Sequence, residues 1–88
     1  MAKYEVQFAT SAAKEFRSLP PQLKRRVSSA IDSLSQDPRP PGVRKLVGHE
    51  HLYRIRVGQY RVVYEINDEG QFIRVTRIRH RREVYRQM

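Results

Sequence analysis

A change in hydrophobic period, at a proline-rich break near the middle of the chain, constrains the fold of these 88 residues more than any other feature. Before the break, apolar residues recur at the spacing of helices, and after it they alternate with polar residues as strands with one buried face do. The break, Asp37-Pro38-Arg39-Pro40-Pro41-Gly42, cannot continue a helix because proline lacks an amide donor. We therefore predict a single α+β domain over residues 1–88, with helices packed on one face of a small antiparallel sheet.

The first half of the chain predicts a short strand and a helical hairpin. Residues 4–8 alternate apolar and polar side chains, which is typical of a strand, and Thr10 or Ser11 is expected to cap the helix that follows. Leu19-Pro20-Pro21 ends this helix, and Pro21 suits the first turn of a second one. The residues expected to face inward from the two helices are Ala12, Ala13, Phe16, Leu23, Val27, Ala30, Ile31 and Leu34.

The second half predicts a meander of three strands, Leu52–Val57, Tyr60–Ile66 and Gln71–Ile78. Gly58-Gln59 suits a two-residue hairpin turn with glycine first, and residues 67–70 form the next turn. The tyrosines at 53, 60 and 64 fall on the apolar side and are expected in the core. The pairing partner of the first strand is left open.

The last predicted strand alternates imperfectly. Ile73 and Val75 share their side with Arg77 and Arg79, so the pattern predicts either a β-bulge or an early end of the strand. The tail from Arg81 to Met88 is expected to form a turn or a final helical turn.

The charge of the chain predicts a polyanionic partner. Lys and Arg total 18 against 9 Asp and Glu, a formal net charge of +9, and 14 of the 18 are Arg. Arginine binds phosphate through a planar fork and stacks on bases, which favours nucleic acid. The basic excess is larger in the strand half, where arginines on the sheet face away from the helices would line an open, slightly concave, positive surface.

Several classes of protein are excluded or disfavoured. The chain has no cysteine, which excludes disulfide scaffolds and cysteine-based metal or catalytic sites and indicates a cytoplasmic protein. The opening MAKYEVQFA does not predict a signal peptide, and no apolar stretch is long enough for a membrane span. His49 and His51 flank Glu50, but this spacing without a third ligand does not predict a metal site.

Two motifs in the strand half resemble the RelE/ParE toxin superfamily, and most closely its RelE branch. They are the hairpin from Tyr53-Arg54 to Tyr60-Arg61-Val62-Val63-Tyr64 and the terminal His80-Arg81-Arg82-Glu83-Val84-Tyr85. The resemblance spans nearly the whole chain. It implies a RelE-like fold of the microbial-ribonuclease type and a toxin that cleaves messenger RNA in the ribosomal decoding site. Cleavage would proceed without metal or cofactor, by attack of the ribose 2′-hydroxyl on the adjacent phosphate.

The resemblance also implies roles for individual residues. Arg61 matches the family's phosphate-binding arginine, Arg81 the arginine that stabilises or protonates the leaving oxygen, and Tyr85 the tyrosine that orients the substrate. Arg56 stands where the best-known relatives have a lysine that serves as base. Because arginine stays protonated at neutral pH, we expect Arg56 to act as an electrostatic clamp. Our hypothesis is that His80 supplies the acid and base instead, since imidazole exchanges protons near neutral pH.

Other basic residues are predicted to bind substrate or ribosome: Arg54, Arg77, Arg79, Lys24, Arg25 and Arg26. The plain alternative for each is a solvated surface charge, and for Arg61 an ion pair with Glu65 or Glu50. Tyr85 has its own structural alternative, an anchor for the C-terminus.

Three functions stay open at this stage. The first is the ribosome-dependent ribonuclease, the second a ParE-like toxin of the same fold that poisons DNA gyrase, and the third a basic RNA- or ribosome-binding module without activity. A toxin implies a small acidic RelB-like antitoxin in a heteromeric complex, alongside messenger RNA and the ribosome.

Overall fold

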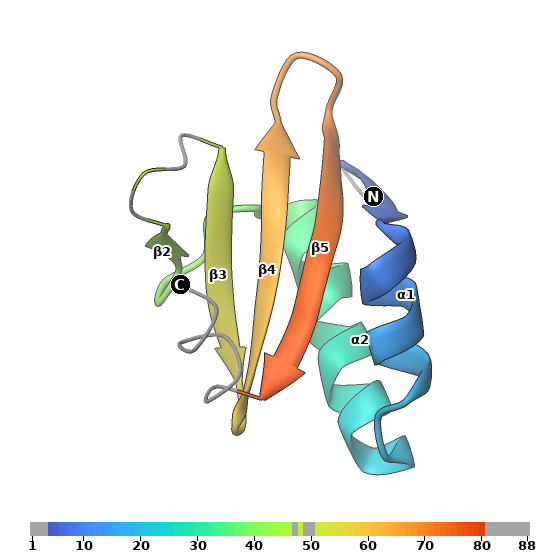
Figure 1. The fold of residues 1–88 in the computed structure, drawn as a ribbon. Coiled ribbons are helices and arrows are strands. Elements are labelled where there is room, and N and C mark those ends of the chain that lie inside the picture. Colours follow the sequence, from blue (N-terminus) through green and yellow to red (C-terminus); the bar gives the residue numbers. More distant parts are fainter. Residues whose placement is uncertain (1–3, 47, 49–50, 81–88) are drawn as a thin grey trace.

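Two helices pack on one face of a five-stranded sheet in the computed structural model of this chain, which describes residues 4–46, 48 and 51–80 (Figure 1). The strand order is β1-β5-β4-β3-β2. The predicted α+β class is therefore confirmed. The elements in chain order are β1 (Glu5–Phe8), α1 (Thr10–Arg17), α2 (Pro21–Gln36), β2 (Arg44–Lys45), β3 (Leu52–Val57), β4 (Tyr60–Asn67) and β5 (Phe72–His80).

The helical hairpin forms where the prolines predict it. Helix α1 ends at Arg17, and α2 begins with Pro21 in its first turn, where a missing amide hydrogen leaves no helical bond unmade. The predicted cap of α1 is wrong. Ala9 precedes the helix and makes no side-chain capping bond, while the Ser11 hydroxyl donates to the Thr76 carbonyl oxygen of β5 at 3.3 Å. The hydroxyl expected to cap the helix instead bonds to the backbone of a strand.

Strand β1 pairs parallel with β5, which answers the question of its partner, and every other pairing is antiparallel. The β3–β4 hairpin turns at Gly58-Gln59 as predicted, with Gly58 at a φ of +60°. Positive φ of this kind favours glycine at the first central position of a two-residue turn. The two-residue strand β2 was not predicted, because its pattern is too short to show a period.

A β-bulge resolves the imperfect alternation of β5. Tyr64 lies opposite Val75 and Val63 opposite Arg77, so Thr76 is an extra residue on β5. The extra residue reverses the alternation, and Ile73, Val75 and Ile78 are all buried in the core as a result. The bulge is confirmed, and the alternative of an early strand end is wrong, since β5 runs on to His80.

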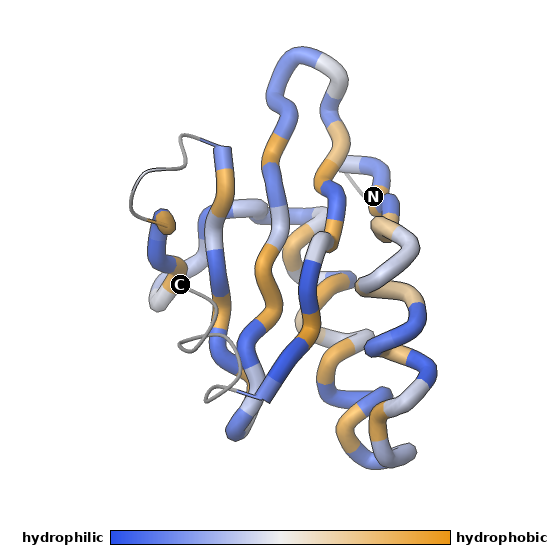
Figure 2. The backbone as a smooth tube through the Cα atoms, viewed as in Figure 1, coloured by the Kyte–Doolittle hydropathy of each residue, from blue (hydrophilic) through white to orange (hydrophobic). Residues whose placement is uncertain are grey.

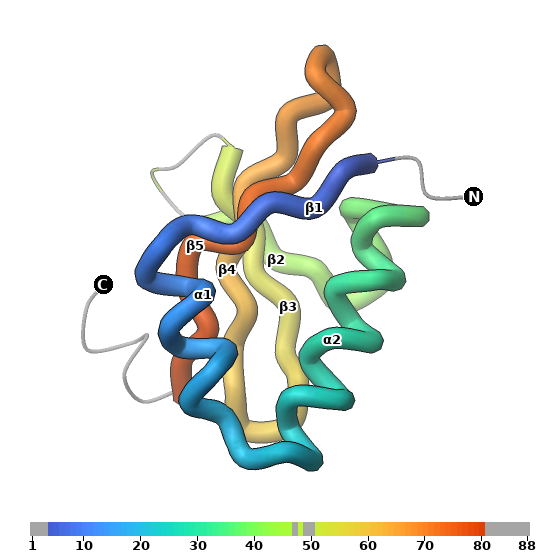
Figure 3. The backbone as a smooth tube through the Cα atoms, turned by 90° about the vertical axis from the view of Figure 1, so that its right-hand side faces the viewer, coloured from blue at the N-terminus to red at the C-terminus, as the bar shows by residue number. Residues whose placement is uncertain are grey.

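The core lies between the helices and the sheet. Ala12, Val27, Ile31 and Leu34 from the helices pack against the strands, including the fully buried Tyr64, and Tyr53 and Tyr60 pack against this cluster as predicted. Figure 2 shows hydrophobic and hydrophilic residues alternating along the strands, and Figure 3 shows α2 along one side of the sheet and α1 in front of it, beside β5. No described helix is long and apolar enough to cross a membrane.

Candidate functional site

Three arginines form one row across the sheet. Arg56 on β3 lies opposite Arg61 on β4, and Arg61 lies opposite Arg79 on β5. Since directly opposed residues in an antiparallel pair have their Cα atoms about 4.5–5.5 Å apart, the row spans about 10 Å. All three belong to the alternation opposite to the core residues Val62 and Ile78, which directs their Cβ atoms to the face away from the helices. The end of the Arg79 side chain turns to the outer edge of β5, where it bonds to Glu15 of α1.

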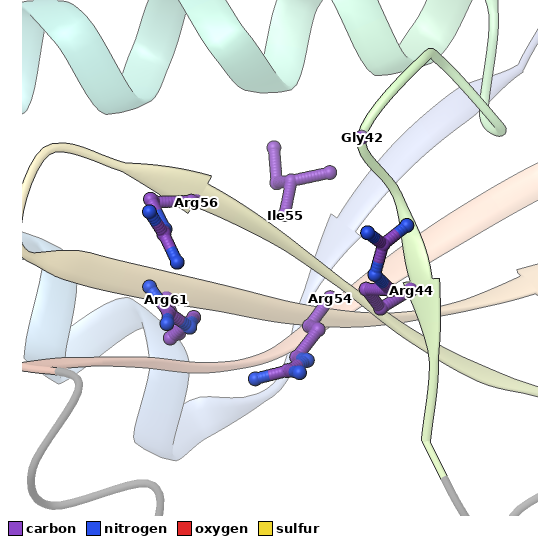
Figure 4. A pocket seen from close by; sticks show the side chains of 6 residues that line it. All are labelled: Gly42, Arg44, Arg54, Ile55, Arg56 and Arg61. Carbon is purple, nitrogen blue, oxygen red and sulfur yellow. The ribbon is translucent and has the colours of Figure 1, made fainter.

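A pocket of about 360 Å³ surrounds the β3–β4 part of this row. Figure 4 shows Arg54, Arg56 and Arg61 on the side of the strands away from α2, with the guanidinium groups of Arg56 and Arg61 facing each other. The predicted meeting of Arg54, Arg56 and Arg61 on one face is therefore confirmed. The lining residues are Gly42, Arg44, Arg54, Ile55, Arg56 and Arg61.

The pocket is electrostatically one-sided. Four of its lining residues are arginines, and none of those in the described part of the chain is acidic. Side by side, like charges repel, and a phosphate group relieves this repulsion while accepting several hydrogen bonds. The arrangement suits an anion with several oxygen atoms, such as the backbone of a nucleic acid.

The burial of Arg61 contradicts the expectation that these arginines all line an open surface. Arg61 is only 4% exposed, whereas Arg56 beside it is exposed. Arg61 therefore forms an inner wall of the pocket, and Arg56 lies nearer its mouth. Of the two carboxylates expected as alternative partners of Arg61, Glu65 pairs with Arg74 at 3.4 Å and Glu50 lies outside the described residues, so this alternative stays open.

Arg44 is a residue of the pocket that sequence reasoning missed. It lies opposite Arg54 in the β2–β3 pairing, and this pairing brings it to the pocket from a different part of the chain. The only signal in the sequence was a basic residue two positions after the proline-rich loop, which is too weak to place it.

Arg77 and Arg79 share a carboxylate from α1. Glu15 accepts a hydrogen bond from the Arg79 Nε and lies 3.7 Å from an Arg77 terminal nitrogen. It also accepts the Ile78 backbone N–H at 2.8 Å. The two arginines predicted to bind substrate thus lie at the β5 end of the arginine row, and Glu15 is a second residue that sequence reasoning missed.

His80 does not join the arginine pocket. Its backbone lies opposite Tyr60, and its ring meets the Tyr60 ring edge-on with centroids 5.5 Å apart. It lines a different hollow, together with Lys14, Glu15 and Tyr60, against α1. Arg79, which bonds to Glu15, lines this hollow too, and His80 is not among the residues that line the arginine pocket. The expected convergence of the imidazole with Arg56 and Arg61 is therefore wrong.

The basic residues of α2 divide between two places. An added Cβ at Gly58 would lie 3.2 Å from an Arg26 terminal nitrogen, so Arg26 reaches the β3–β4 turn that carries the pocket. Lys24 and Arg25 instead line a shallow hollow on the helical side, with Phe16, Ser28 and Asp32. Only Arg26 of these three is near the arginine row.

Two predicted catalytic residues, Arg81 and Tyr85, lie outside the described residues, as do His49 and Glu50. In the part of the chain that is described, there is no group of three or more His, Cys, Asp or Glu side chains that could hold a metal ion. The prediction of cleavage without metal stays a prediction.

A polar clasp holds the opposite end of the sheet. Asp68 accepts hydrogen bonds from Arg39 at 3.0 Å and from the Tyr4 hydroxyl at 2.8 Å, and these bonds lower the pKa of its carboxyl group. The Arg39 guanidinium lies 5.3 Å from the centre of the Tyr53 ring. The Tyr64 hydroxyl donates to the Pro38 carbonyl oxygen at 2.6 Å, and burial raises the pKa of this tyrosine. The clasp ties the proline-rich loop to the sheet.

Comparison with known proteins gives one consistent result. The family described as "ParE toxin of type II toxin-antitoxin system, parDE" matches residues 6–85. The toxin RelG of Mycobacterium tuberculosis is 36% identical, over 94% of this chain and 97% of that protein. Toxin RelE3 of Methanocaldococcus jannaschii is 32% identical, over 92% of this chain and 94% of that protein.

Solved structures agree with this. A chain in the archaeal RelE–RelB complex from Pyrococcus horikoshii superposes with a TM-score of 0.80 at 33% identity, covering 90% of this chain and 96% of that one. A chain in the intact Escherichia coli RelBE toxin–antitoxin complex superposes with a TM-score of 0.79 at 26% identity, covering 88% and 95%.

Proposed function

The chain belongs to the RelE/ParE superfamily of type II toxin–antitoxin toxins, and from this premise we propose that it is a ribosome-dependent endoribonuclease that cuts messenger RNA in the decoding site. It is a toxin of a RelBE-type system. The observation that carries the proposal is the row of Arg56, Arg61 and Arg79 beside a pocket lined by arginines.

The proposed chemistry is attack of a ribose 2′-hydroxyl on the adjacent phosphorus. The new P–O bond forms a 2′,3′-cyclic phosphate while the bond to the 5′-oxygen breaks, and the 2′-proton leaves as the 5′-oxygen gains one. Charge builds up on the phosphate oxygens on the way, and fixed guanidinium groups stabilise it more than they stabilise the substrate. Arg61, which is held inside the pocket, is proposed to bind the scissile phosphate, and Arg56 to clamp it from the exposed side.

Arg54, Arg79 and Arg77 are proposed to bind the flanking RNA backbone, and Arg81 and Tyr85 to complete the site as the family resemblance implies. The proton-transfer groups stay unassigned among the described residues, because arginine stays protonated at neutral pH and His80 lies toward α1. A small nuclease without strong acid and base groups of its own depends on a larger assembly to orient its substrate, which supports the requirement for the ribosome.

The test is cleavage of a defined message on purified ribosomes. The products should carry 5′-hydroxyl and 2′,3′-cyclic phosphate ends. Replacing a buried group that stabilises transition-state charge costs about 10²–10³ in rate, so Arg61→Ala should lose this much. Arg74→Ala is the matched control, because Arg74 pairs with Glu65 at the other end of β5 and should cut as the wild type does. Intact message after incubation with the wild-type toxin would refute the proposal.

Two other functions predict different results in the same preparation. The description of the matched family names the ParE toxin. A ParE-like toxin that poisons gyrase would leave messages whole and inhibit DNA supercoiling. A basic module without activity would bind ribosomes with steep salt dependence and produce no cyclic-phosphate ends.

We also propose that the partner of this toxin is a small acidic RelB-like antitoxin. The support is the net charge of +9 and the similarity to toxin chains that were solved as RelE–RelB complexes. An extended acidic segment would cover the arginine pocket and exclude RNA from it. Co-expression with its cognate acidic antitoxin should restore growth, and the complex should not cleave message until the antitoxin is removed.

A further inference from the structure

Side chains of helix α1 hydrogen-bond to the outer edge of β5 beyond the point where β1 ends. Strand β1 ends opposite Val75, yet β5 continues to His80. Over this extension Ser11 donates to the Thr76 carbonyl oxygen, and Glu15, one helical turn later, accepts the Ile78 N–H. Side chains at i and i+4 of a helix lie on one face, so α1 supplies the bonds that a neighbouring strand would otherwise make.

The carboxylate of Glu15 does more than pair the strand edge. One oxygen accepts the Ile78 N–H, and the other accepts the Arg79 Nε and lies 3.7 Å from an Arg77 terminal nitrogen. The side chain of Glu15 is 18% exposed and that of Arg79 is 23% exposed, so both are largely shielded from water. Such a charge-assisted bond on Nε restricts both the direction and the plane of the guanidinium group.

The position of Arg79 at the end of the arginine row explains why the orientation of its guanidinium group has to be fixed. The Arg79 Cα lies opposite that of Arg61, at the end of a row of like charges. Within the described residues, Glu15 is the carboxylate that hydrogen-bonds to this row. A long arginine side chain in such a field would otherwise turn toward solvent and occupy many rotamers.

We propose that Glu15 is a positioning residue of the RNA-cleavage site. It holds the Arg79 guanidinium at the outer edge of β5, at the end of the arginine row, so that Arg79 binds the RNA backbone without first losing its side-chain freedom. This inference rests on the ribonuclease function proposed above, and it goes further by naming a residue of α1, outside the arginine pocket, as part of the machinery. The simpler reading is that Glu15 only stabilises the edge of β5.

A double-mutant cycle separates the two readings. Glu15→Gln keeps the shape and an oxygen that can accept the Ile78 N–H, but it removes the charge that holds Arg79. We expect kcat on programmed ribosomes to fall about tenfold to hundredfold, the range that a misplaced group costs, with KM changed much less. In the Arg79→Ala background the same substitution should cause no further fall in kcat, because Glu15 acts through Arg79.

The matched control is Glu65→Gln. Glu65 pairs at 3.4 Å with Arg74, which lies on β5 as Arg79 does. Removing this carboxylate should leave kcat unchanged. A Glu15→Gln protein that cuts at the wild-type rate would overturn the positioning role. So would equal losses from Glu15→Gln with and without Arg79, because a purely structural effect is independent of that side chain.

A second measurement does not depend on cleavage. The Nε–H proton of Arg79, assigned with Arg79→Lys, should exchange slowly with water in the toxin and at least about tenfold faster in Glu15→Gln, while Glu65→Gln leaves it unchanged. Equal exchange in toxin and Glu15→Gln would overturn the inference. If the wild-type toxin cut no message, the ribonuclease function would fall, and this exchange rate alone would decide whether Glu15 orients Arg79.

Discussion

The Gly58-Gln59 turn sets the register on which the arginine pocket depends, and Gly58→Ala tests this dependence. The turn lies two residues from Arg56 on one side and two from Arg61 on the other. Gly58 has a φ of +60°, where a Cβ costs an L-residue about 1–2 kcal/mol, and the new methyl carbon would lie 3.2 Å from Arg26 Nη1. Since Arg26 ends in a flexible chain, it can move by a few tenths of an ångström, and backbone strain dominates.

The expected loss of stability is therefore about 1–2 kcal/mol, and each kcal/mol lowers the Tm of a domain of this size by about 4–8 °C. Thermal unfolding measures this directly. Cleavage should fall by more than stability explains, because relief of the strain moves Arg56 relative to Arg61, and a shift of about 1 Å costs up to about 10²-fold in rate.

Gly48→Ala is the matched control for this substitution. Gly48 also has a positive φ, +81°, but an added Cβ would meet nothing within 4 Å, and Gly48 does not line the pocket. It should lower the Tm through backbone strain and leave cleavage per folded molecule unchanged. The reasoning is refuted if Gly58→Ala also loses only stability, since the turn would then have no influence on how the two arginines meet.

Three further predictions concern the clasp at the other end of the sheet. Tyr64→Phe removes the hydroxyl that donates to the Pro38 carbonyl oxygen and should cost about 1–2 kcal/mol in urea unfolding, because a buried acceptor loses its bond. Burial raises the pKa of Tyr64 above its ordinary 10.0. The stability that the neutral hydroxyl contributes is therefore complete below about pH 10 and is lost as the pH rises further. In Tyr64→Phe the Tm should fall less steeply over this alkaline range. The hydrogen bonds from Arg39 and Tyr4 hold the pKa of the Asp68 carboxyl below its ordinary 3.8. The stability that the charged carboxylate contributes is therefore present above pH 3.8 and is lost as the pH falls through the lower pKa of the folded state. Asp68→Asn should lose less Tm in acid than the wild type, and an identical acid transition would contradict this.

Local patterns were enough to predict most of the elements. Proline at 20 and 21 ended one helix and started the next, because the ring cannot donate a helical hydrogen bond. Glycine at 58 allowed the hairpin turn, and alternation identified Val62, Tyr64 and Ile66 as core residues. Even the bulge could be predicted from the mismatch between Val75 and Arg77, because a break in alternation requires an extra residue or an early end.

The site was predicted only in part, for a physical reason. Arg56 and Arg61 are joined by a two-residue turn, so their meeting follows from local register. Arg44 and Glu15 reach the site from distant parts of the chain, and no local pattern shows which strand β2 pairs with or which edge α1 completes. His80 was expected beside Arg56, but its side is decided by the register of β5, which places it against Tyr60.

By itself, the sequence determined the order of helices and strands, the basic charge and the arginine hairpin, because these depend on residues close together along the chain. Only the tertiary structure decided that β1 runs parallel to β5, that Arg61 is buried while Arg56 is exposed, and that a glutamate of α1 binds the arginine at the end of the row. Such contacts join residues up to 67 positions apart, as Glu5 and Phe72 in the β1–β5 pairing. They arise from the way whole elements pack, and packing is a property of all the buried surfaces together.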